Sequence, residues 1–186
     1  MQHIGLILPS YPSYSETFIK NKVEGLITHG YRVSLYVGGI QNKQYYLNDV
    51  PVYYQLDTKK IIKLIFIFII KLIFHPIYFI KFFYLEFRSN RQIINIIKNL
   101  IINCHFFNHK LDWIHFCYAT MGVGRENLAK TIGAKMAVSF RGYDIDLYPI
   151  KNLGCYNLLW KNIDKVHTIS DNLYNKAIAL GLSRNV

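Results

Sequence analysis

The chain has 186 residues, of which 52% are hydrophobic and 18% charged, so it is neither a disordered nor a collagen-like protein. Its length predicts a single domain. The 22 lysines and arginines outnumber the 11 acidic residues. The net charge of +11 favours an anionic partner, which could be a phosphate-bearing ligand, a nucleic acid or an anionic membrane surface. Three scattered cysteines without a CxxC pair argue against a disulfide framework, and the absence of an apolar leader predicts a cytoplasmic chain.

Most of the chain alternates between strand and helix patterns. Short apolar runs rich in β-branched and aromatic residues indicate strands, and apolar residues three and four apart indicate helices. In chain order the predicted elements are a strand over 4–8, a helix over 15–29, strands over 32–37 and 50–56, a helix over 90–102, a strand over 112–117, a helix over 124–132, a strand over 134–140, a helix over 153–162, a strand over 165–169 and a helix from 170 or 171 to 181. This alternation predicts an α/β fold, a Rossmann-like parallel sheet with helices on both faces.

Residues 59–110 interrupt this pattern with a basic, apolar helical segment, which Pro76 divides in two. At 100° per residue, Lys60, Lys63 and Lys71 fall within an arc of about 80°. Such a helix can lie in the interface of an anionic membrane with its lysines at the headgroups. It can also be a core helix whose lysines reach water, or a true span. We expect interfacial contact, and hence a peripheral position on the inner face of the cytoplasmic membrane.

Ligands of an open parallel sheet bind outside the carboxyl ends of its strands, near the switch in strand order. Helix N-termini at the same edge favour anions, so polar residues that follow strands are candidates for binding a charged ligand. The candidates are Ser15, Glu16 and Thr17 after the first strand, His115 at the end of the strand over 112–117, Arg141, Gly142 and Asp144 after the strand over 134–140, and Ser170 after the last strand.

Each of these candidates also has a structural interpretation. His115 could be a core histidine whose hydrogen bonds are satisfied within the fold, and Glu16 could serve simply to complete a helix cap. Arg141 and Asp144 could pair with each other and fix their loop. For Ser170 a helix cap is the favoured interpretation.

Two other functional classes receive little support. His105 and His109 stand four residues apart beside Cys104, a spacing that could seat a metal ion, but no carboxylate is in step with them. The basic residues lie among isoleucine and phenylalanine rather than among exposed polar residues, which argues against nucleic-acid binding. No dinucleotide, P-loop or hydrolase motif is present.

Four segments carry a resemblance to a known family. In chain order they are SETFIKNKVEGLITHGYRVSLYV, DWIHFCYATMG, AKMAVSFRGYDID and DKVHTISDNLYNKAIALGL. They resemble elements of glycosyltransferase family 4, the retaining, nucleotide-sugar-dependent enzymes of the GT-B fold, in the branch that acts in polysaccharide and colanic-acid-type assembly. The basic helical segment, with its break at His75 and Pro76, also has a counterpart there.

The resemblance implies that this chain, residues 1–186, is the N-terminal, acceptor-side domain of a two-domain enzyme. The C-terminal domain of that family grips the nucleotide-sugar through a Glu-x7-Glu element, which this sequence lacks, so we expect no turnover by this chain alone. That domain would be supplied in cis or in trans. His115 would be the catalytic histidine near the reacting sugar, and no cofactor or metal is expected. Relatives often have histidine where this chain has Cys117 and Arg141.

Two functions follow from these expectations. The first is half of an enzyme that moves a sugar from a nucleotide-sugar to a saccharide or lipid-linked acceptor in cell-surface polysaccharide synthesis. The second is a non-catalytic subunit of a split glycosyltransferase that binds the acceptor and anchors it at the membrane.

Overall fold

The predicted α/β fold is confirmed by a computed structural model, which describes residues 1–13, 16–38, 46–47, 49–54 and 61–186 and, within the last range, the side chains from residue 64 onward. Within these ranges one sheet has seven strands: β1 (His3–Leu8), β2 (Arg32–Val37), β3 (Tyr46–Leu47), β4 (Val50–Tyr54), β5 (Trp113–Phe116), β6 (Lys135–Phe140) and β7 (Lys165–Thr168). The strands lie in the order β3-β4-β2-β1-β5-β6-β7, and β3 pairs antiparallel with β4 while the other neighbours are parallel.

The strand order reverses between β1 and β5. From β1 the chain proceeds outward to β2 and β4, and then returns to the other side of β1 for β5, β6 and β7. The register places Leu6 of β1 beside both Leu35 of β2 and His115 of β5, and His115 beside Ala137 of β6. Since residues in register on neighbouring strands share a face of the sheet, His115 points to the same side as Leu6.

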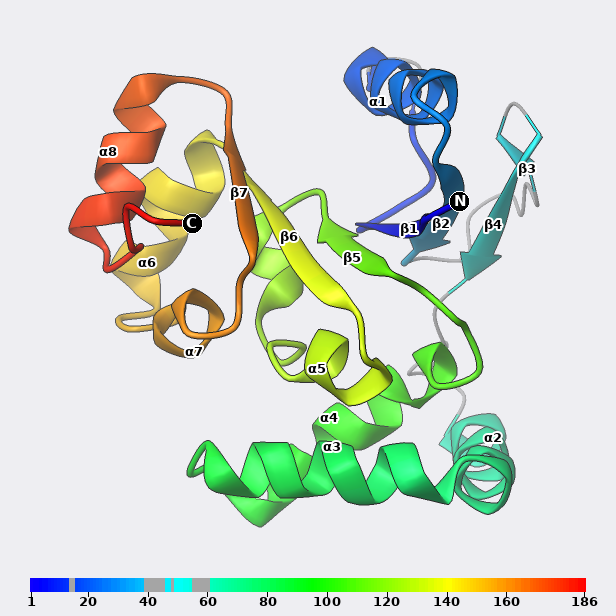
Figure 1. Cartoon of the computed structure of the whole chain (residues 1–186). Coiled ribbons are helices and arrows are strands. Elements are labelled where there is room, and N and C mark those ends of the chain that lie inside the picture. Colours follow the sequence, from blue (N-terminus) through cyan, green and yellow to red (C-terminus); the bar gives the residue numbers. More distant parts are fainter. Residues whose placement is uncertain (14–15, 39–45, 48, 55–60) are drawn as a thin grey trace.

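Helix α1 (Thr17–Thr28) covers one face of the sheet, where its Ile19 and Val23 pack against Leu6 and Leu35. The opposite face carries a second core, which includes Phe116 of β5. Helices that contribute to it are α3 (Pro76–Arg88), α4 (Ile93–Asn103), α5 (Leu128–Ile132) and α7 (Asn157–Trp160). Figure 1 shows α1 on one side of the strands and α3 and α4 on the other.

Three short turns of helix and two further helices lie after α4 in the described chain. They are η1 (Cys104–Phe106), η2 (Ala119–Gly122), η3 (Tyr143–Leu147), α6 (Tyr148–Lys151) and α8 (Asp171–Ala179). The helix predicted over 124–132 begins only at Leu128, because η2 and a glycine turn with Gly124 at φ 78° take up the residues before it. The π-helical turn η3 and helix α6, which follow β6, were not predicted.

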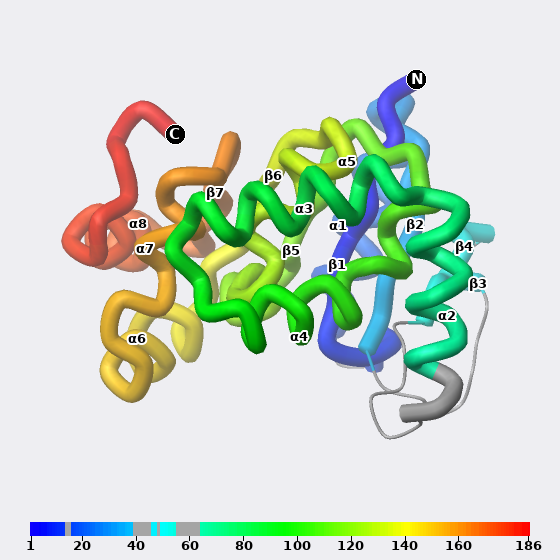
Figure 2. Tube along the Cα trace, turned by 90° about the horizontal axis from the view of Figure 1, so that it is seen from below, coloured from blue at the N-terminus to red at the C-terminus, as the bar shows by residue number. Residues whose placement is uncertain are grey.

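The basic segment forms α2 (Ile61–Phe74), α3 and α4, which lie across one side of the sheet (Figure 2). The axes of the helices over 64–74 and 76–88 differ by 104° across the break at His75. In the part of the chain that the structure describes, no single helix is long and apolar enough to cross a membrane, although this bent pair meets that test of length and composition jointly.

A buried polar network attaches α3 to the domain. Glu86 of α3 is fully buried, and its two carboxylate oxygens accept hydrogen bonds from Asn127 at 2.7 Å and Asn99 at 2.8 Å. Arg91 approaches the same carboxylate at 3.3 Å and pairs with Glu126 at 2.7 Å. Because a buried carboxylate without partners is costly, these contacts specify how α3 sits against α4 and α5.

Candidate functional site

Three polar side chains meet on the α1 face of the sheet, beside the point where the strand order reverses. The ammonium group of Lys22, on α1, lies 2.9 Å from Nε2 of His115 and 3.3 Å from the hydroxyl of Ser139. His115 Nε2 also lies 2.8 Å from the Ser139 hydroxyl. These residues are brought together by α1, β5 and β6, and with Arg141 we name them the switch-point cluster.

His115 is neutral at physiological pH in this environment. Burial lowers the pKa of its imidazole well below the usual value, and the nearby Lys22 and His167 lower it further. Because Lys22 can only donate, the contact between the two side chains requires Nε2 of His115 to accept and its proton to reside on Nδ1. Burial also lowers the pKa of Lys22, and the positive charge of Arg141 adds to that effect.

Arg141 supplies the second fixed positive charge of the cluster. Its guanidinium group lies 3.8 Å from the ring centroid of Phe18 and 5.3 Å from that of Tyr118, so it is held between two aromatic rings. Over the described ranges, neither Lys22 nor Arg141 forms an ion pair with a carboxylate. Two neighbouring cations that form no ion pair with a described carboxylate favour the binding of an anion.

Glu16 and Asp144 position the loops around this cluster. The Glu16 carboxylate accepts hydrogen bonds from the Tyr118 hydroxyl at 3.0 Å and from the backbone N–H of Ser13 at 2.8 Å, and the second of these bonds is the one that Glu16 makes when it completes a helix cap. Asp144 is buried and accepts from the backbone N–H groups of Thr120 at 3.2 Å and Arg141 at 3.1 Å. Asp144 therefore joins the loops that follow β5 and β6, through backbone groups and not through the Arg141 side chain.

The remaining candidates have simpler places. Ser170 is the N-cap of α8, where its hydroxyl accepts a hydrogen bond from the backbone N–H of Leu173 at 3.3 Å, so the favoured interpretation as a cap is confirmed. Thr17 is exposed at the start of α1, and Gly142 directly precedes η3. Ser15 lies outside the described residues.

Of the three lysines expected to contact the membrane, Lys60, Lys63 and Lys71, the structure describes the side chain of Lys71. Lys60 lies outside the described residues, and nothing is described of the Lys63 side chain. Lys71 is half-buried and lies close enough to η1 for its charge to lower the pKa values of Cys104, His105 and His109. It stands about 20° around α2 from the buried Leu64, at 100° per residue.

Sequence reasoning missed Lys22 and Ser139. Lys22 precedes a buried valine on an amphipathic helix, a position that is typical of a solvated lysine. Ser139 gave a weak signal, since it lies two residues beyond Ala137 and therefore on the face that carries His115. Among the described residues no group of three or more histidine, cysteine or acidic side chains is arranged to hold a metal ion.

No protein-family model matches this sequence, and no curated protein matches it.

Proposed function

We propose that this chain is the acceptor-side, N-terminal domain of a retaining glycosyltransferase. It would act with a donor-binding domain to move a sugar from a nucleotide-sugar to a saccharide or lipid-linked acceptor in cell-surface polysaccharide synthesis. The observation that carries this proposal is the positive charge of Lys22 and Arg141 beside the reversal in strand order, where neither side chain forms an ion pair with a carboxylate in the described ranges.

The chemistry of such a transfer suits these residues. The bond from the sugar to the nucleoside diphosphate breaks, and the leaving diphosphate develops negative charge that fixed cations stabilise. Lys22 and Arg141 can supply the stabilising positive charge without a metal ion or other cofactor. Neutral His115 can hydrogen-bond a hydroxyl of the reacting sugar, and Ser139 and Lys22 fix the orientation of its ring.

Binding of a nucleoside diphosphate tests this proposal with the chain as it exists. Calorimetric titration with UDP and GDP should show that the unchanged protein binds them. The Lys22→Gln variant should bind them about tenfold to a hundredfold more weakly. This range corresponds to the loss of one hydrogen bond to a charged group, about 1.5–3 kcal/mol. Lys151→Gln, which removes an exposed charge on α6, is the matched control and should bind as the unchanged protein does. Equal affinities for the two variants would contradict the proposed role of the cluster.

A second candidate, the non-catalytic membrane-anchoring subunit, is favoured by the surface of α2, α3 and α4. Soluble monomers rarely expose large contiguous apolar patches, and such patches mark membrane or protein contacts. The exposed side chains of this apolar surface are Ile65, Phe66, Ile69, Leu72, Ile73 and Phe74 of α2, Ile77, Ile80, Phe83, Tyr84 and Phe87 of α3, and Ile93, Ile94 and Ile97 of α4. Lys81, Arg88 and Lys98 are exposed on the same helices, as expected for contact with anionic headgroups.

Co-sedimentation with anionic vesicles tests the membrane contact. The double change Phe66→Ser and Phe74→Ser should weaken binding at least about tenfold, since burial of each side chain contributes about 1.5–3 kcal/mol. Ile150→Ser with Leu153→Ser removes apolar residues elsewhere that are at least as exposed, and it should have little effect. Vesicle binding without nucleoside diphosphate binding would favour the anchoring subunit over the transferase domain.

A further inference from the structure

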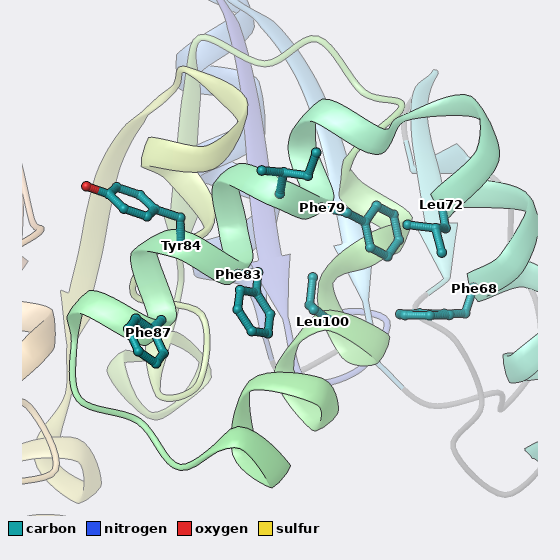
Figure 3. Close-up of a pocket in the computed structure, with 8 residues that line it drawn as sticks. Phe68, Leu72, Phe79, Phe83, Tyr84, Phe87 and Leu100 are labelled. Atoms are coloured by element: carbon teal, nitrogen blue, oxygen red, sulfur yellow. The ribbon is translucent and has the colours of Figure 1, made fainter.

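An apolar groove runs along α3 within the apolar surface. It has a volume of about 470 Å³ and is lined by Phe68 and Leu72 of α2, Phe79, Phe83 and Phe87 of α3, and Leu100 of α4. Figure 3 shows these side chains converging between the three helices, with the Tyr84 ring at one end of the row and Phe68 and Leu72 at the other. A groove with this almost entirely apolar lining suits a hydrocarbon chain.

A basic cavity lies at the end of α3. It has a volume of about 560 Å³, and its lining includes Arg88, Lys130 and Lys161 and no described carboxylate. Its wall is held in place by hydrogen bonds, because Lys130 donates to Asn162 at 2.6 Å and Asn162 donates to Asn127 at 3.1 Å. Three cations around a polar, ordered wall suit a phosphate group, which arginine and lysine bind through charge-assisted hydrogen bonds.

Arg88 links the two cavities. It lines the basic cavity, and its guanidinium group lies 5.7 Å from the centroid of the Tyr84 ring, which lines the groove. The apolar groove and the cationic cavity therefore approach each other within one helical turn of α3, from Tyr84 to Arg88. This arrangement complements an amphiphile that has a phosphate at one end and a hydrocarbon chain at the other.

We propose that the groove and the basic cavity together bind one phospholipid of the membrane, with its phosphate among Arg88, Lys130 and Lys161 and an acyl chain along α3. This inference rests on the membrane contact proposed above, and adds to it a site for a single lipid molecule. The site lies on the face of the sheet opposite to the switch-point cluster, so it holds the domain to the membrane without occupying the cluster.

Vesicles of phosphatidylcholine with and without phosphatidic acid test the headgroup site. The unchanged protein should prefer vesicles that contain phosphatidic acid, and Lys130→Gln with Lys161→Gln should reduce that preference at least about tenfold. Lys151→Gln with Lys165→Gln removes the same net charge from exposed positions outside the cavity and should reduce it less than about threefold. Equal effects of the two double variants would overturn the lipid site and leave the membrane contact standing, whereas no binding of the unchanged protein to either vesicle would overturn both.

A soluble comparison tests the groove. Lysophosphatidic acid should bind at least about a hundredfold more tightly than glycerol 3-phosphate, because each buried methylene contributes about 0.8 kcal/mol. Phe83→Asn should remove most of that difference, and circular dichroism checks that the variant remains folded. Equal affinity for inorganic phosphate and for lysophosphatidic acid would show that the cavity binds free phosphate, and would overturn the proposal.

Discussion

Replacing Glu86 with alanine removes the centre of the buried network that holds α3 against the domain. The change deletes the acceptor for Asn99 at 2.8 Å and for Asn127 at 2.7 Å, and it leaves Arg91 paired with Glu126 alone. Loss of one partner from a buried charged network costs about 3–5 kcal/mol. For a chain of 186 residues this corresponds to a melting temperature lower by roughly 6–20 °C.

Urea unfolding followed by circular dichroism measures this loss. Glu86→Gln is the matched control, because it keeps the shape and one acceptor oxygen, and it should cost less than the alanine variant, about 1–3 kcal/mol. A cost below about 1 kcal/mol for alanine would refute the reasoning, since it would mean that water or a rearranged α3 satisfies the amides of Asn99 and Asn127.

Two further predictions concern acid stability and the loops of the site. Burial lowers the pKa of His105 to about 3, so between about pH 6.5 and 3 the unfolded chain binds a proton that the folded chain does not. The contribution of His105 to stability is therefore complete above pH 6.5 and is lost as the pH falls. The urea midpoint of His105→Phe should decline less steeply than that of the unchanged protein over this pH range. An unchanged slope would contradict the burial of this ring. Asp144→Ala leaves the backbone N–H groups of Thr120 and Arg141 without their acceptor, so we expect a loss of about 2–4 kcal/mol and weaker binding of UDP, measured by urea unfolding and calorimetry. Unchanged UDP affinity in a folded Asp144→Ala protein would separate this loop from the site.

The local pattern of the sequence predicted much of the fold because strands and helices each impose a period on apolar residues. The strand predicted over 32–37 matches β2, and the break predicted at Pro76 separates α2 from α3. Element ends were less certain where turns follow glycines, as with the late start of α5 at Leu128. The turn η3 gave no signal, since a π-helical turn has no apolar period of its own.

Which residues could form the site was also partly readable from the sequence. Arg141 and Asp144 follow a strand and His115 lies near the end of one, and parallel strands place their carboxyl ends at one edge of the sheet. Lys22 was not predicted, because it lies 93 positions from His115 and only the packing of α1 on β5 brings their side chains to 2.9 Å.

The amino-acid sequence by itself determined the order of strands and helices along the chain and the arc of the predicted helix that carries Lys60, Lys63 and Lys71, since both follow from local periodicity. Only the tertiary structure decided which way each face points. Lys71 lies on the side of α2 that packs near η1, and the isoleucine and phenylalanine side of the helix is exposed. A helical period defines an apolar face, but the elements that pack against it determine whether that face is buried, and these elements come from distant parts of the chain.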